Sequence, residues 1–103
     1  NMELIAGKLD LFPHLESALA SEQVSKHKPD PEVYLKSAAN LSLTPDRCLV
    51  FEDSFSGVSA AKNAGMKVVA VLSSHQKSDL PPCDWYIEDY SEIRPDLIHQ
   101  LIP

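Results

Sequence analysis

The stretch CLVFEDSFSGV, residues 48–58, decides the fold. Its apolar run, residues 48–51, is typical of a strand buried on both faces of a parallel sheet. The run stops abruptly at a pair of acids, and small residues at helical spacing then predict a helix over 56–64. A second apolar run predicts another strand over 67–72, so the segment forms one strand–helix–strand crossover.

The flanking segments alternate in the same way. Apolar spacing and breakers predict a helix over 2–10, a strand over 15–21, a helix from Pro31 to about residue 41, a strand over 84–87 and a last helix that begins at Pro95. Such alternation predicts an α/β fold, with three layers (α/β/α) around a parallel sheet. The length fits one domain over residues 1–103, and Trp85 is expected in its core.

Composition excludes several classes of protein. The chain is 44% hydrophobic and 23% charged, which is ordinary for a globular domain, and no apolar run reaches the length of a membrane span. The net charge is −6 with no lysine or arginine stripe, so nucleic acid and anionic membranes are not expected as partners. Cys48 and Cys83 form no CxxC pair, which favours reduced thiols and a cytoplasmic location, with Cys48 in the core.

Glu52 and Asp53 are the first candidates for chemistry, because ligands bind beyond the carboxyl ends of strands in open parallel sheets. Two carboxylates at this point suit Mg²⁺, which takes oxygen ligands together with waters and substrate phosphate. The alternative is structural: Asp53 or Ser54 caps the helix that follows. The residues alone leave both interpretations open.

Lys28 is the second candidate. It lies in a loop between the strand predicted over 15–21 and the next helix, and so reaches the same edge of the sheet. A lysine there would supply positive charge to a phosphate. A lone lysine is usually a solvated surface residue, but Pro29 and Pro31 stiffen this loop. The histidines show no spacing typical of metal ligands, and His75 is expected at the surface.

Two segments together identify a resemblance. The segment KPDPEVY, residues 28–34, resembles the K-P-x-P-x-x-[FY] segment of haloacid dehalogenase superfamily phosphatases. VFEDSFSGV, residues 50–58, with AA at 60–61 and AGM at 64–66, is similar to their E-D-S-x-x-G-[VI]-x-A-A-x-x-A-G-M segment. The pattern is most similar to the branch of beta-phosphoglucomutase-like enzymes and sugar-phosphate phosphatases, and it implies a partial Rossmann-like fold.

The resemblance implies a role for each matching residue. The family's loop lysine, which steadies the nucleophile and the phosphoryl group, corresponds to Lys28. The acidic pair that anchors Mg²⁺ directly or through water corresponds to Glu52 and Asp53. Ser54 and Gly57 match positions that shape the loop and the start of the helix. The remaining matches, with a polar substrate-binding position at Asn1, are looser.

The family's nucleophile motif, D-x-D-G-[TS], does not occur in the sequence. Its first Asp forms an aspartyl-phosphate, so the resemblance implies that this chain is the C-terminal half of a catalytic domain. The nucleophile strand and the helical cap would then lie elsewhere. We therefore expect a segment of a Mg²⁺-dependent phosphatase or phosphosugar mutase that acts on small phosphorylated metabolites and is inactive alone.

Two other functions fit parts of the sequence. An apolar strand that ends in Glu-Asp also resembles the Walker-B strand of a nucleotide hydrolase, but no GxxxxGK[ST] loop is present. A truncated domain could instead serve as a binding or assembly module that self-associates through an open sheet edge. If not with itself, such an edge would pair with the missing N-terminal half.

Overall fold

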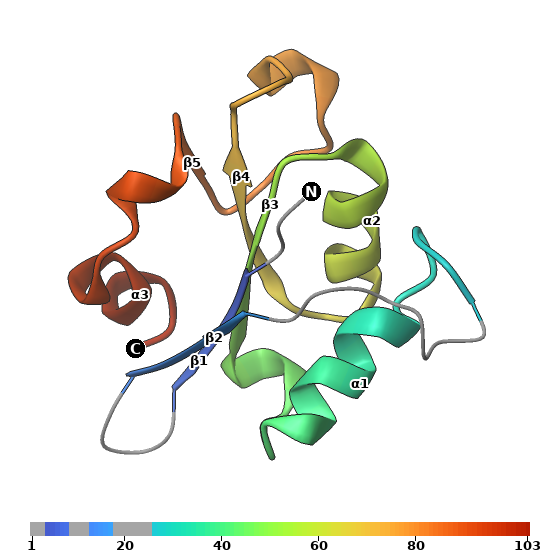
Figure 1. Cartoon of the computed structure of the whole chain (residues 1–103), viewed down its shortest axis with the longest axis vertical. Helices are drawn as coiled ribbons and strands as arrows, with labels where there is room; N and C mark the ends of the chain where they lie inside the picture. The colour runs from blue at the N-terminus through green and yellow to red at the C-terminus, as the bar shows by residue number, and fades with distance from the viewer. Residues whose placement is uncertain (1–3, 9–12, 18–25) are drawn as a thin grey trace.

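The computed structural model describes residues 4–8, 13–17 and 26–103 of the chain (Figure 1). A five-stranded sheet runs through it in the order β2-β1-β3-β4-β5. The strands are β1 (Leu4–Lys8), β2 (Pro13–Ser17), β3 (Cys48–Glu52), β4 (Lys67–Val71) and β5 (Trp85–Ile87). The helices are α1 (Glu32–Asn40), α2 (Phe55–Asn63) and α3 (Pro95–Leu101), with 3-10 turns at Pro45–Arg47, Lys77–Asp79 and Tyr90–Glu92.

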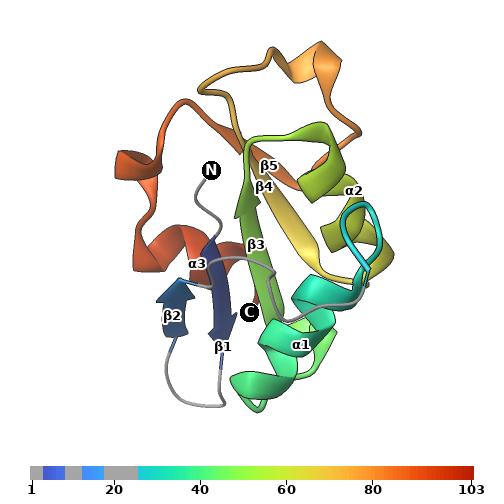
Figure 2. The same ribbon diagram turned by 45° about the vertical axis from the view of Figure 1, so that its right-hand side comes forward.

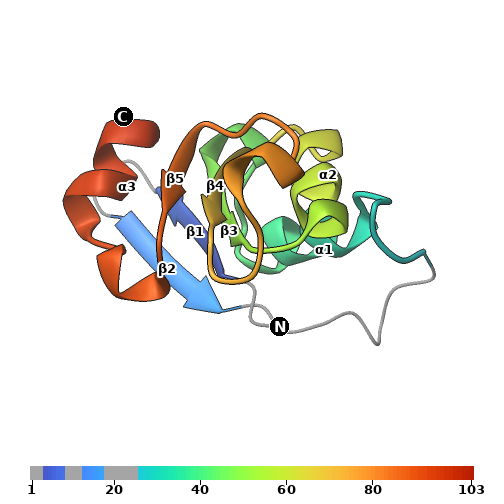
Figure 3. The same ribbon diagram turned by 90° about the horizontal axis from the view of Figure 1, so that it is seen from above.

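Helices cover both faces of the sheet, which confirms the predicted three layers. Figure 2 shows α1 and α2 on one side of the central strands and α3 on the other, and the view from above in Figure 3 shows the same separation. Val50 and Val68 face the α1–α2 layer, whereas Leu49 and Val69 face α3. Every residue of β3 is buried, because a strand covered on both faces has no solvent side.

The crossover predicted from residues 48–72 is confirmed. Strands β3 and β4 are parallel neighbours with Val50 opposite Val68, and α2 connects them. The small side chains of Ala60 and Ala61 are fully buried, so α2 lies close to the sheet. The helix ends before Gly65, whose φ of +80° is a conformation that glycine adopts without strain.

The prediction of a helix over 2–10 is wrong, because residues 4–8 form strand β1. This strand pairs antiparallel with β3, with Ile5 opposite Val50, so the sheet is mixed rather than wholly parallel. The buried strand β3 would otherwise expose a row of unpaired backbone groups on that side, and pairing with β1 satisfies them. The strand predicted over 15–21 is confirmed in part as β2, since residues 18–25 lie outside the described ones.

Trp85 was expected in the core, and this prediction is wrong. It keeps 44% of its surface exposed because it lies at the first position of β5, the strand at the edge of the sheet. The predictions for the last helix and for Cys48 are confirmed: Leu97 and Ile98 of α3 are buried against the sheet, and Cys48 is fully buried. None of the helices in the described residues is long and apolar enough to cross a membrane.

Candidate active site at the carboxyl end of strand β3

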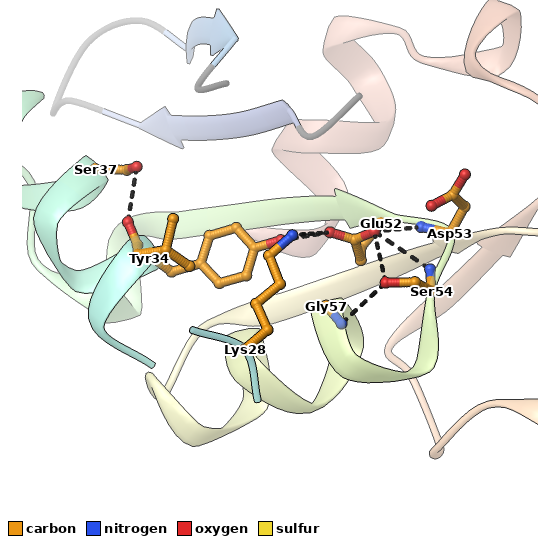
Figure 4. A network of polar contacts seen from close by, with 8 residues as sticks. Lys28, Tyr34, Ser37, Glu52, Asp53, Ser54 and Gly57 are labelled. Atoms are coloured by element: carbon orange, nitrogen blue, oxygen red, sulfur yellow. Dashed lines mark hydrogen bonds and ion pairs between the residues drawn. The ribbon is translucent and has the colours of Figure 1, made fainter. Parts of the chain in front are cut away.

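Three elements bring the candidate residues together. Strand β3 ends at Glu52, Asp53 follows it, and Ser54 is the N-cap of α2. Lys28 comes from the loop that precedes α1, and Tyr34 comes from the buried face of α1. Figure 4 shows the side chains of Lys28 and Tyr34 pointing at the Glu52 carboxylate from one side, while the Asp53 carboxylate points away from it.

Glu52 is the centre of this network and is fully buried. Its Oε1 accepts three hydrogen bonds: from the backbone N–H of Asp53 at 3.0 Å and from both the N–H and the hydroxyl of Ser54 at 3.2 Å. Its Oε2 accepts a short bond of 2.6 Å from the Tyr34 hydroxyl and lies 3.5 Å from Nζ of Lys28. Both carboxylate oxygens are therefore engaged, as a buried anion requires.

Packing against Glu52 explains why residue 57 is a glycine. A Cβ at this position would overlap the carboxyl group of Glu52, so only glycine leaves room for the buried anion. The Gly57 N–H donates to Oγ of Ser54 at 3.0 Å, which caps α2. The capping alternative is thus correct for Ser54, and the loop-shaping roles expected of Ser54 and Gly57 agree with these contacts.

The Lys28 loop is fixed at several points. The side chain of Asn63 donates to the Pro29 carbonyl at 3.0 Å and joins the loop to the end of α2. The Asp30 carboxylate accepts the Glu32 N–H at 3.0 Å, so it satisfies a first-turn donor although Pro31 occupies the N-cap position. These contacts direct Lys28 toward Glu52, and its side chain is only 17% exposed.

Charge and burial have opposite effects on Glu52. Burial disfavours its ionised form, but the Tyr34 hydrogen bond, the Lys28 charge and the Asp53 N–H together lower the pKa of Glu52 below its ordinary value. Burial, and then the Glu52 charge, raise the pKa of the Tyr34 phenol far above its ordinary value. At neutral pH the site therefore holds a carboxylate, a neutral phenol that donates, and an ammonium group.

Asp53 is different from its neighbour. Its Oδ1 is buried and has no hydrogen-bond partner in the part of the chain that the structure describes. Burial and the adjacent Glu52 carboxylate raise the pKa of Asp53, because two neighbouring anions disfavour each other. An unpartnered carboxylate oxygen fits a hard cation such as Mg²⁺, which is held by one or two protein carboxylates plus water and phosphate.

The described residues do not enclose a metal by themselves. Within the described ranges, no group of three or more His, Cys, Asp or Glu side chains is gathered in a way that could hold an ion. The role of Asp53 and Glu52 at a metal therefore stays a prediction. Of the two, Asp53 has the available oxygen, and Glu52 is occupied by donors from the protein.

Two residues beside the site had no signal in the sequence. His75, expected only at the surface, is exposed, and its Nδ1 lies 2.9 Å from the Asp53 carbonyl oxygen. Tyr90 follows β5, and burial together with the charges of Asp53 and Glu52 raises its pKa to about 12. Both come from loops at the carboxyl ends of β4 and β5, a convergence that only the sheet order reveals.

Asn1 falls outside the described residues, so its predicted substrate role stays untested. Phe55, which follows the acidic pair at the start of α2, is 58% exposed.

Comparison with known proteins shows the family of the chain. The family model of haloacid dehalogenase-like hydrolases matches residues 2–71, and the chain belongs to this family. Protein CbbY from Rhodobacter capsulatus is 38% identical over 93 residues, which cover 89% of this chain and 40% of that protein. A phosphorylated carbohydrates phosphatase from Thermotoga maritima is 45% identical over 60 residues, or 58% of this chain and 28% of that protein.

Solved structures place the chain among the same folds. The crystal structure of beta-phosphoglucomutase from Clostridium difficile superimposes with a TM-score of 0.68 at 25% identity, over 78% of this chain and 34% of that one. The chain thus resembles the branch of beta-phosphoglucomutase-like enzymes and sugar-phosphate phosphatases. It spans two fifths or less of the length of these relatives.

Proposed function

We propose that the chain supplies the cation and phosphate side of the active site in a Mg²⁺-dependent phosphatase or phosphosugar mutase. The observation that carries the proposal is the meeting of three groups at the end of β3. These are the Lys28 ammonium, the buried Glu52 carboxylate that pairs with it, and the buried Asp53 oxygen that has no partner among the described residues.

Each residue would have a distinct task. Lys28 would place positive charge against the oxygens of the phosphoryl group, where negative charge is spread in the transition state. Asp53 would hold the cation through Oδ1. Glu52 would contribute to the cation only through the position that it gives to Asp53 and Lys28. When bound, Mg²⁺ supplies further neutralisation of the phosphoryl oxygens.

The nucleophile must come from elsewhere in the parent protein. The sequence contains no D-x-D motif, and Glu52 is committed to its hydrogen bonds. We propose that the parent forms an aspartyl-phosphate on an Asp outside these 103 residues. The chain alone is then inactive, because the described part of the site offers a candidate cation ligand and a positive charge but no carboxylate left over to attack phosphorus.

The proposed substrate is a small phosphorylated metabolite of the carbohydrate class, with water or a sugar hydroxyl as acceptor. Support comes from the relatives, one of which is a phosphorylated carbohydrates phosphatase. We also infer a cytoplasmic location, consistent with two free cysteines, and no nucleic-acid or membrane partner.

The test uses the protein expressed from its full reading frame. Phosphate release from a panel of sugar phosphates would be measured with Mg²⁺ for the wild type, for Asp53→Asn and for Asp96→Asn. Asp96 is an exposed carboxylate on α3 that pairs with Arg94, so it is a matched control. We expect activity that is lost on removal of Mg²⁺ and in Asp53→Asn but kept in Asp96→Asn. Full activity in Asp53→Asn, or hydrolysis by the 103-residue chain alone, would contradict the proposal.

Self-association is a second proposal, which the exposed Trp85 on edge strand β5 favours. Sedimentation at increasing concentration should then show a growing mass that Trp85→Thr reduces. A constant monomer mass would exclude it.

A further inference from the structure

We propose that Tyr34 is a positioning residue: its hydroxyl holds the Glu52 carboxylate, so that this carboxylate does not draw the Lys28 ammonium away from the phosphoryl group. The inference rests on the proposed function, because Lys28 matters only if phosphate binds there. It concerns a side chain on the buried face of α1 that would touch neither substrate nor cation.

Tyr34 and Lys28 contact the same carboxylate oxygen of Glu52 at different distances. The Tyr34 hydroxyl lies 2.6 Å from Oε2 of Glu52, whereas Nζ of Lys28 lies 3.5 Å from it. Bonds between an ammonium and a carboxylate are ordinarily about 2.7–2.9 Å long, so the lysine contact is loose and the tyrosine contact is tight. Figure 4 shows the phenol and the ammonium arriving at this oxygen side by side.

Burial explains why the hydroxyl matters. Tyr34 and Glu52 have no exposed surface, and the Lys28 side chain keeps 17%. A buried carboxylate oxygen needs a donor, and here the interior of the protein supplies one. Without the phenol, the oxygen would draw on Lys28, and the ammonium would move inward from the edge where a ligand arrives.

The ring of Tyr34 also contacts the Lys28 ammonium. Nζ of Lys28 lies 5.7 Å from the ring centroid, within the range of a cation–π contact. Tyr34→Phe keeps this ring and its packing in α1 and removes only the hydroxyl. The substitution therefore isolates the effect of the hydrogen bond from that of the core.

The test observes the Lys28 ammonium directly in the 103-residue chain. Lysine would be labelled with ¹⁵N at Nζ, and the Lys28 signal would be assigned by its loss in Lys28→Arg. In Tyr34→Phe we expect hydrogen exchange of the Lys28 ammonium to slow by roughly three- to tenfold, the factor that corresponds to one ordinary hydrogen bond. An unchanged or faster exchange in folded Tyr34→Phe would overturn the proposal.

Tyr86→Phe is the matched control. Tyr86 also faces a lysine, with Nζ of Lys77 at 4.5 Å from its ring, but its hydroxyl accepts a backbone N–H of Cys83 rather than donating to a carboxylate. Its loss should leave the Lys28 signal unchanged. If Tyr34→Phe does not fold, replacement of the tyrosines by 3-fluorotyrosine keeps the shape and strengthens the donor, and Lys28 exchange should then accelerate. No change on fluorination would overturn the proposal.

Activity then separates this inference from the proposed function. In the protein from the full reading frame, Tyr34→Phe should reduce kcat/KM by roughly three- to tenfold, in step with the change in Lys28 exchange. Slowed exchange in a protein without phosphatase activity would uphold the positioning role and contradict the proposed function. An active enzyme in which Tyr34→Phe leaves Lys28 exchange unaltered would uphold the proposed function and contradict the positioning role.

Discussion

Replacement of Glu52 by Gln is the most informative perturbation of the buried network. The amide keeps the shape of the carboxylate, and its oxygen can still accept the three bonds from Asp53 and Ser54. Its NH₂ group would replace Oε2 and face the Lys28 ammonium, so that two donors oppose each other. The substitution therefore removes the charge and the ion pair but creates no cavity.

The cost can be bounded from the contacts. Hydrogen bonds to a charged group contribute about 1.5–3 kcal/mol each, against about 0.5–1.5 kcal/mol for neutral ones. Four hydrogen bonds to Glu52 become neutral or are lost, and relief from burying a charge offsets part of the difference. We expect Glu52→Gln to lower the free energy of unfolding by about 2 to 4 kcal/mol at pH 7.

The pKa of Glu52 determines how this difference in unfolding free energy changes with pH. Because the folded chain lowers the pKa of Glu52, the ionised carboxylate stabilises the fold above its unfolded pKa, near the ordinary value of 4.5. This stabilisation is lost as the pH falls from there through the lower pKa of the folded state. The difference between wild type and Glu52→Gln should therefore be constant from pH 6 to 8 and shrink below about pH 4.5.

Urea unfolding at a series of pH values measures this difference. Asp96→Asn is the control, because Asp96 forms an exposed pair with Arg94 at 3.6 Å and such pairs contribute less than about 1 kcal/mol. Equal stability of Glu52→Gln and wild type at pH 7 would refute the reasoning. A difference in unfolding free energy that is as large below about pH 4.5 as at pH 7 would also refute it.

Two further predictions concern the same site, and a third concerns the two cysteines. Gly57→Ala should cost about 1–3 kcal/mol in urea unfolding, although alanine is the better helix former, because its Cβ overlaps Glu52; unchanged stability would contradict the overlap. Asp53→Asn should stabilise the metal-free chain at pH 7, since the folded state raises the pKa of Asp53 and so disfavours its ionised form; a less stable variant would contradict this. The same substitution should abolish any rise in Tm that Mg²⁺ causes. Cys48 is fully buried, and burial and Asp46 raise its pKa to about 11. In the native chain at pH 8 we therefore expect the half-buried Cys83 to be alkylated before Cys48; mass spectrometry that finds Cys48 alkylated first would contradict this burial.

The central crossover could be predicted because its signals are local. The apolar run of β3, the serine that caps α2 and the glycine that ends it all lie within residues 48–65, where each pattern implies one conformation. Residues 4–8 carry no such signal. Their strand conformation depends on the free edge of β3, which is more than 40 residues away in the chain.

The candidate site shows the same division. Lys28, Glu52 and Asp53 could be identified from motif and position, because all lie at the carboxyl end of a strand or in a stiff loop beside it. The Tyr34 hydroxyl could not, since its position 18 residues before Glu52 gives no sign of a contact. His75 depends likewise on the fold, which brings a loop after β4 against Asp53.

The central claim is that this chain supplies the cation and phosphate side of an enzyme whose nucleophile lies outside it. The coding sequence immediately upstream of the Asn1 codon tests the claim most directly. We predict an in-frame D-x-D-G-[TS] motif followed by a helical segment. A stop codon in frame before the Asn1 codon, with no such motif between them, would contradict the claim and leave the assembly role as the better account.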